Sequence, residues 1–271
     1  MLRNWIGAFG FASCFFAMPA MAANSIIVNG STTVLPIMQV MVETYMKNHP
    51  GVSITVSGGG SGNGIKALLD KSADIAMSSR EMKDPELKLA KEKGIVPEHM
   101  AIAIDAVLPM VHPDNSVINL TRAELQAIYA GTIKNWKEVG GTDKGIVVIS
   151  RDSSSGTYEA WNELIMSKEK VTPSALLSAS SGTMIQAVSK NRYAIGYDSY
   201  GYLNSSVKAM QVDGIEGTPE TAASGKYPLS RKLWILTAGK PQGAVADFIA
   251  FIMGPEGQAI VAQKGAVPVN K

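Results

Sequence analysis

Short apolar runs alternate along this chain with polar, glycine-rich loops and with longer amphipathic stretches. Three times the order is the same: an apolar run, a loop of Gly, Ser and Thr, and then apolar residues at helical spacing. The runs SIIV, SITV and VVIS precede the loops NGSTT, SGGGSGNG and RDSSSGT. A repeated succession of strand, loop and helix predicts an α/β protein.

The amphipathic stretches after the loops predict helices. Val34, Met38, Met41 and Tyr45 fall near one face of a helix over residues 34–49. The second loop leads into a helix at IKALLD, followed by a buried strand at DIAMSS, and the third leads into a helix at YEAWNELIM. Each polar loop is therefore expected where a strand ends and a helix begins.

That location favours anion binding. The first N–H groups of a helix have no partner within the helix, and the aligned peptide dipoles place partial positive charge there. Ser and Thr add hydroxyl donors, and Gly lets the backbone approach a small oxyanion closely. Arg151, which opens the third loop, adds a full positive charge with five N–H donors in a fixed fork. Three such loops facing one cleft are expected to hold a small oxyanion.

Helix capping is the alternative for each loop taken alone, because Ser, Thr and Gly are also common caps and turn residues. The second loop is not a nucleotide motif. It lacks the Lys directly after the closing glycine of a phosphate loop, and its glycines do not open a dinucleotide-binding unit.

Composition narrows the function further. The chain has 271 residues, of which 46% are hydrophobic and 18% charged, with a formal net charge of +2, as in ordinary globular proteins. No Lys/Arg run with interleaved aromatics indicates a nucleic-acid surface. His49, His99 and His112 have no metal-ligand spacing. We expect no metal and no cofactor.

The first 23 residues are predicted to be a secretory signal peptide. A basic start at Arg3 precedes an apolar run through Met18 and small residues ending in Ala20-Met21-Ala22, with cleavage after Ala22 or Ala23. The run is shorter than the roughly 20 residues that span a bilayer. Cys14, the single cysteine, lies in FASC, which loosely resembles a lipid-attachment site, but we expect it to be removed with the signal peptide. The mature protein is expected in the periplasm.

The chain resembles the exported phosphate-binding proteins of ABC transporters, the PstS-like family. The resemblance runs over nearly all of the mature chain. Its most specific part is IYAGTIKNW followed by RDSSSGTYEAW, and the other matching segments are NGSTTVLPIMQ, SGGGSGNGIKAL, DIAMSSR, AIGYDSYGYL and GPEGQAIVAQKGAVPVN.

This resemblance implies a two-lobed periplasmic-binding-protein fold, type II-like, with the ligand in the cleft between the lobes. It implies a first lobe made of residues 24–108 and 203–271, and a second lobe made of residues 109–202. The expected crossings are IDAVLPMVH and AIGYDSYGYL. It also implies a monomer that hands inorganic phosphate to the permease of an ABC transporter.

Carried over by position, the resemblance places the phosphate ligands on the three loops and on the end of one strand. They are Ser31, Thr32, Thr33, Ser61, Ser79, Arg151, Ser155, Gly156 and Thr157.

The chain departs from the best-described members of this family at Ser79, where they have an aspartate. A carboxylate there accepts the remaining proton of hydrogen phosphate and repels sulfate, whereas a hydroxyl accepts that proton without repelling sulfate. Asp152 is expected to orient its neighbours or to be solvated. Arg80 is left with two alternatives, contact with the ligand or a salt bridge at the rim of the cleft.

Several functions stay open at this level. The first alternative is a binding protein for another oxyanion, such as sulfate, molybdate or arsenate. A hydrolase that uses a Ser-rich loop is less favoured, because no G-x-S-x-G elbow surrounds Ser61 or Ser155 and no histidine is placed as a base. A receptor or adhesion module with the same fold is the third alternative, since fold does not fix function.

Overall fold

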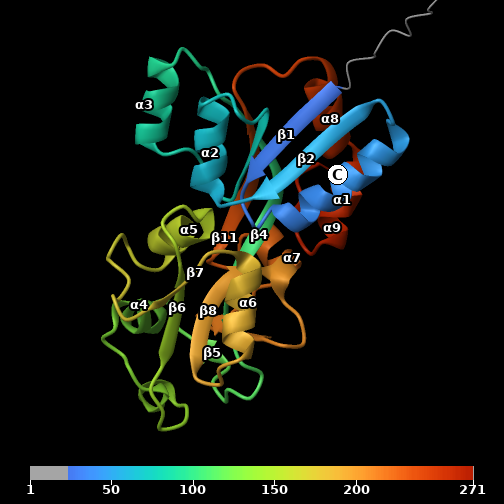
Figure 1. Cartoon of the computed structure of the whole chain (residues 1–271). Helices are drawn as coiled ribbons and strands as arrows, with labels where there is room; N and C mark the ends of the chain where they lie inside the picture. Colours follow the sequence, from blue (N-terminus) through green and yellow to red (C-terminus); the bar gives the residue numbers. More distant parts are fainter. Residues whose placement is uncertain (1–23, 271) are drawn as a thin grey trace, which may run out of the picture.

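One long strand connects the two halves of this protein. The computed structural model describes residues 24–270, and in it β4 (Glu98–Val111) pairs with β11 (Ser230–Thr237) along its first part and with β8 (Ala194–Ser199) along its last part. The sheet order is β2-β1-β3-β11-β4-β8-β6-β7. Helices pack on both sides of each half, which gives the two lobes seen in Figure 1. The predicted signal peptide, with Cys14, lies outside the described residues.

The first lobe is built on the parallel strands β1, β2 and β3, with β11 antiparallel to β3. Its strands besides β4 and β11 are β1 (Asn24–Gly30), β2 (Val52–Gly58), β3 (Ile75–Ser78) and β12 (Val267–Pro268). Its helices are α1 (Leu35–Asn48), α2 (Ser61–Leu69), α3 (Asp84–Glu92), α8 (Gly243–Met253) and α9 (Pro255–Gln263). Helices α1, α8 and α9 bury one apolar cluster against the sheet, and α2 and α3 bury another.

The second lobe has β6 between the parallel strands β7 and β8. Its strands besides β8 are β5 (Asn119–Leu120), β6 (Val147–Arg151), β7 (Leu176–Ser178), β9 (Lys208–Ala209) and β10 (Gln211–Val212). Its helices are α4 (Arg122–Ala130), α5 (Gly156–Leu164), α6 (Ser181–Ser189) and α7 (Pro219–Ala223), with 3-10 turns at Trp136–Val139 and Tyr200–Tyr202. One apolar cluster, which includes the buried Trp136 and Trp161, forms its core.

The structure confirms the helices and strands that were predicted from the spacing of apolar residues. The helix expected over 34–49 is α1, whose buried residues include Met38, Met41, Val42 and Tyr45 at helical spacing. The strand expected at DIAMSS is β3, and all four of its residues are buried. Each of the three polar loops does lie between a strand end and a helix start.

The predicted return of the chain to the first lobe at residue 203 does not match the packing. Val207, Met210, Val212, Tyr227 and Leu229 are buried in the core of the second lobe. Strands β9 and β10 also pair with second-lobe partners, and the chain joins the first-lobe sheet only at β11. We therefore propose a first lobe of residues 24–106 and 230–270 and a second lobe of residues 107–229.

Within residues 24–270, no single helix is long and apolar enough to cross a membrane. Helices α8 and α9 reach that length and apolarity only when taken together, and they are bent by 57° at the break between them.

Candidate functional site

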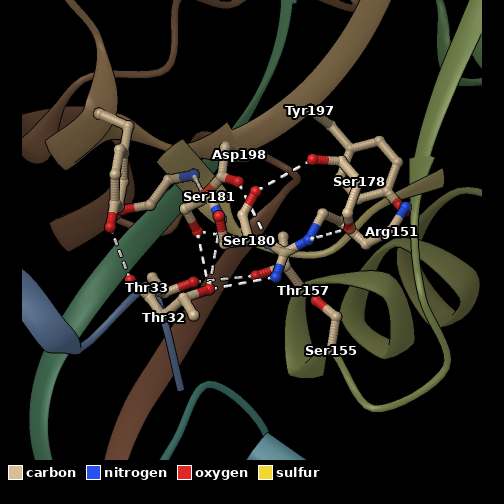
Figure 2. Close-up of polar contacts among 12 residues, drawn as sticks. Thr32, Thr33, Arg151, Ser155, Thr157, Ser178, Ser180, Ser181, Tyr197 and Asp198 are labelled. Carbon is tan, nitrogen blue, oxygen red and sulfur yellow. Dashed lines mark hydrogen bonds and ion pairs between the residues drawn. The ribbon is translucent and has the colours of Figure 1, made fainter. Parts of the chain in front are cut away.

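The predicted site residues gather where the two lobes meet. The strand β1 ends in a loop that carries Ser31, Thr32 and Thr33, and Ser61 begins α2. On the second lobe, Arg151 ends β6, and Gly156 and Thr157 begin α5 directly after Ser155. All nine predicted residues are buried. The structure therefore brings them together at the contact between the lobes, as Figure 2 shows for those that it labels.

The first loop is shaped by a close backbone approach. Gly30 has a φ of 138°, and a Cβ at this position would lie 2.2 Å from the carbonyl oxygen of Met77. A side chain is excluded there, so the chain turns tightly at the end of β1. The Oγ of Ser31 then accepts hydrogen bonds from the amides of Thr33 and Val34, at 3.2 and 3.4 Å. Ser31 therefore stabilises the turn before α1.

Two threonines of this loop contact the second lobe. The Oγ1 of Thr32 accepts a hydrogen bond of 3.1 Å from Nη2 of Arg151, and the Oγ1 of Thr33 lies 2.9 Å from the Oγ1 of Thr157. The carbonyl of Thr32 also accepts from the hydroxyl of Tyr202 at 2.7 Å. These contacts connect the end of β1 with both β6 and α5, so the structure shows the lobes in a closed arrangement.

Ser61 and Ser79 form the other part of the first-lobe wall. The Oγ of Ser61 accepts from the amide of Ser79 at 3.0 Å, and the two hydroxyl oxygens are 3.3 Å apart. They face the start of α5 so closely that a Cβ on Gly156 would lie 2.3 Å from Ser61 Oγ and 2.6 Å from Ser79 Oγ. Only a glycine at position 156 lets the two walls come together in this way.

Arg151 is held from several sides. Its Nε donates to the carbonyl of Ser178 at 3.1 Å, and its Nη1 lies 3.3 Å from both Ser181 Oγ and Asp198 Oδ2. Its backbone amide donates to the hydroxyl of Tyr197 at 3.3 Å. The side chain is 1% exposed, so its charge acts in a water-poor environment where electrostatic interactions are strong.

Ser181 and Asp198 were not among the predicted residues. Ser181 begins α6 after the cap Ser180, and its Oγ lies 3.3 Å from Thr32 Oγ1. A signal for it was present, because the sequence Ser-Ser-Gly-Thr at 180–183 repeats the one at 154–157, and both lie at helix starts. Asp198 is fully buried beside Arg151; burial raises the pKa of its carboxyl group, and the charge of Arg151 opposes that rise.

Ser155 and Asp152 have local structural contacts. The Oγ of Ser155 accepts from the amide of Tyr158 at 3.3 Å, which caps α5. Asp152 accepts hydrogen bonds from the amide and the hydroxyl of Ser154. Of the two predictions for Asp152, the structure supports an orienting contact, although it orients the turn and not the guanidinium of Arg151.

Arg80 forms a salt bridge, which is one of the two alternatives that the sequence left open for it. Its two terminal nitrogens each lie 2.7 Å from an oxygen of Glu86, in the bidentate geometry that suits a guanidinium. Its side chain is 9% exposed. A second ion pair, between Lys83 and Glu159 at 2.5 Å, connects the first lobe to α5 in the second.

The groups gathered at the contact between the lobes are of the kinds that bind small anions. Helices α2, α5 and α6 all begin at it, and their N-termini contribute partial positive charge. The hydroxyl groups of Thr32 and Ser181 lie at the buried Arg151, those of Thr33 and Thr157 face each other across the lobes, and those of Ser61 and Ser79 lie against Gly156. Among residues 24–270, no group of three or more His, Cys, Asp or Glu side chains is arranged to hold a metal ion. The hydroxyl, N–H and guanidinium donors are those that suit a compact oxyanion.

Comparison with known proteins agrees with this arrangement. The model of the PBP superfamily domain matches residues 18–256. The phosphate-binding protein PstS of Borreliella burgdorferi is 32% identical, over 90% of this chain and 89% of that protein. PstS of Pseudomonas aeruginosa is 30% identical, over 89% of this chain and 81% of that protein.

Two solved structures are similar over the whole fold. One is a substrate-binding protein from Clostridium perfringens, assigned to phosphate ABC transport and solved with bound phosphate. It has a TM-score of 0.86 and 37% identity, over 91% of this chain and all of that one. The other is an ABC-type phosphate transport receptor from Vibrio cholerae, with a TM-score of 0.74 and 35% identity, over 89% of this chain and 99% of that one. With its two lobes and the helix starts gathered at their contact, this chain belongs to the PstS family of phosphate-binding proteins within the PBP superfamily.

Proposed function

We propose that this protein captures inorganic phosphate between its lobes and delivers it to the permease of an ABC transporter. The observation that carries the proposal is the buried Arg151, which donates across the cleft to Thr32 of the other lobe. A positive charge among hydroxyl groups and helix starts offers a tetrahedral oxyanion many donors at once. The bound phosphate of the similar Clostridium perfringens protein supports the same assignment.

The anion-binding residues are proposed to be the nine predicted ones together with Ser181. Among them, Thr32, Thr33, Thr157 and Ser181 are proposed to contact the anion through their hydroxyl groups, and Arg151 through its guanidinium. Ser31 and Ser155 have their hydroxyl groups engaged in the turns before α1 and α5, so we propose that they act through those turns.

Binding of this kind is expected to hold the lobes closed. An anion that contacts both walls has a higher affinity for the closed form, and it therefore shifts the population toward that form. The protein is proposed to act as a monomer, to lose residues 1–23 on export and to work in the periplasm. Mass spectrometry of the protein isolated from its own cells tests the cleavage site directly.

Phosphate binding is tested by equilibrium dialysis. The purified protein is freed of bound anion by partial unfolding and refolding, and then dialysed against labelled phosphate. We expect saturation at one phosphate per chain, and an absence of saturable binding contradicts the proposal. Competition with sulfate, molybdate and arsenate separates phosphate from the other oxyanions, because the ion that displaces labelled phosphate at the lowest concentration is the preferred ligand.

We also propose that the protein is not an enzyme. The three histidines have contacts elsewhere: His49 stacks on Tyr45, His99 packs against Trp234, and His112 lies beside Asp114. A serine nucleophile needs a base within hydrogen-bond reach. Turnover of a chromogenic phosphoester that is lost in Ser155→Ala would contradict this and favour the hydrolase.

A further inference from the structure

The guanidinium of Arg151 has most of its donors occupied by protein atoms. A guanidinium carries five N–H groups. Acceptors lie within hydrogen-bond distance of all three nitrogens: Ser178 for Nε, Ser181 and Asp198 for Nη1, and Thr32 for Nη2. The orientation of the group is therefore set by the protein before any anion is considered.

Asp198 is the carboxylate that faces this guanidinium. Its Oδ2 lies 3.3 Å from Nη1 of Arg151, and the two side chains are 0% and 1% exposed. Its Oδ1 accepts from the amide of Ser199 at 2.8 Å, which fixes the carboxylate at the end of β8. Asp152 is adjacent to Arg151 in sequence but contacts Ser154. The formal charges of Arg151 and Asp198 cancel, so the pair is positioned and close to neutral.

We propose that Asp198 is a specificity-determining residue of the cleft, which by pairing with Arg151 lowers the affinity for sulfate relative to that for singly charged phosphate. This inference rests on the proposed phosphate-binding function and deepens it. Ser79 carries no charge that could repel sulfate. The preference between sulfate and phosphate is then set by the other charged groups of the cleft.

The physical reason lies in the scaling of Coulomb energy with charge. Water screens charges poorly in a buried site, so the negative charge of Asp198 acts strongly on an anion bound beside Arg151. Its repulsion of a doubly charged ion is twice its repulsion of a singly charged ion at the same place. The hydroxyl and amide donors offer both ions similar hydrogen bonds. Asp198 therefore disfavours sulfate, which is always doubly charged, more than singly charged phosphate.

The hinge contains a second buried pair that serves as a matched control. Asp105 of β4 accepts from Ser199 Oγ at 2.6 Å, and its Oδ2 lies 2.9 Å from Nη2 of Arg231 on β11. The Asp105 side chain is 0% exposed, like that of Asp198. It differs in that its cationic partner is Arg231, not Arg151. Asp105→Asn thus removes a buried carboxylate at the hinge without changing the partner of Arg151.

The test is a pair of titrations of the full protein, freed of anion, with phosphate and with sulfate at one pH just below neutral. Phosphate is mainly singly charged there, and Asp198, whose pKa is raised by burial, keeps its negative charge better than at lower pH. In Asp198→Asn we expect the affinity for sulfate relative to phosphate to rise on the order of tenfold or more over that of the unchanged protein. In Asp105→Asn we expect this ratio to stay within about threefold, because a general loss of hinge stability affects both ions alike.

Each outcome decides the inference. A ratio that stays constant or shifts toward phosphate in Asp198→Asn overturns it, and so does an equal rise in both variants, which indicates a structural effect of losing any hinge carboxylate. Where Asp198→Asn does not fold, Asp198→Ser also removes the charge and is judged by the same ratio. If the unchanged protein binds no phosphate, the proposed function fails; if it binds phosphate and the ratio does not rise in the variant, only this inference fails.

Discussion

The two walls of the cleft differ in the kind of hydrogen-bond donors that they present. The first-lobe wall presents hydroxyl and amide groups, from Thr32, Thr33, Ser61 and Ser79, and the second-lobe wall presents the ion pair of Arg151 and Asp198 beside its own hydroxyl groups. Neutral donors lose less free energy on desolvation than charged groups do. We therefore propose that the second lobe supplies a fixed guanidinium whose charge is balanced by Asp198, and that the first lobe completes the donor set when the lobes close.

The largest expected effect on this comparison comes from Arg151→Ala. Phosphate would lose the guanidinium, and Asp198 would be left buried without its counter-charge. We expect phosphate binding to weaken by about 2 to 5 kcal/mol, as for other truncated buried charge pairs. Phosphate titrations measure this, with Arg122→Ala as control, because Arg122 is an exposed arginine whose ion pair with Asp213 lies outside the cleft. An unchanged affinity in Arg151→Ala would remove this residue from the site.

Gly156→Ala is expected to keep the two walls apart. The added Cβ would lie 2.3 Å from Ser61 Oγ, so closure requires one wall to shift, at a cost of about 3 kcal/mol at the upper end of typical overpacking. We expect weaker phosphate binding with little change in the melting temperature of the ligand-free protein.

The matched control for this change is Gly182→Ala, at the same place in the second Ser-Ser-Gly-Thr sequence. A Cβ at position 182 would meet only Ser180 Oγ, at 4.0 Å. Phosphate titrations on both variants compare them. Equal affinity of Gly156→Ala and the unchanged protein would show that binding does not need this close approach of the lobes.

Thr157→Ala is expected to have a smaller effect, because it removes one hydroxyl group from the second-lobe wall. That hydroxyl lies 2.9 Å from Thr33 Oγ1 in the closed arrangement. We expect the binding free energy for phosphate to weaken by about 1.5 to 3 kcal/mol, the range for one hydrogen bond to a charged group. Isothermal titration measures the change, and Thr157→Ser, which keeps the hydroxyl, is expected to retain most of the affinity. Equal weakening in both variants would point to the methyl group instead.

The smallest expected effect comes from Lys83→Met. The ion pair with Glu159 joins the lobes at the rim, but the lysine side chain is 40% exposed and solvent screens its charge. We expect phosphate binding to weaken by at most about 1 kcal/mol at low salt and not at all at high salt. Lys66→Met, which breaks an exposed pair inside the first lobe, is the control. A large loss of phosphate affinity in Lys83→Met that persists at high salt would contradict the view that solvent screens this ion pair.

The elements around the site could largely be predicted from the sequence. Helix α1 and strand β3 have strong apolar patterns, and the three loops have the composition of helix starts. The fourth helix start, at Ser181, was missed because β7 before it has only three residues, two of them exposed, and so shows no apolar run. The repeated Ser-Ser-Gly-Thr sequence was the signal available.

Asp198 and the path of residues 203–229 could not be predicted from local pattern. Asp198 is one acidic residue in a buried strand, and its partner Arg151 is 47 positions away in the sequence. Strands β9 and β10 have two residues each, too few for a period to show which lobe they join. Both features depend on tertiary packing, which decides where short segments lie.

Small-angle X-ray scattering of the anion-free and phosphate-saturated protein tests the central claim, that one anion clamps the two walls together. The account predicts a smaller radius of gyration with phosphate, close to that of the closed structure, and a larger one without it. It also predicts that the contraction is lost in Gly156→Ala. Saturable phosphate binding without any contraction would contradict the clamp.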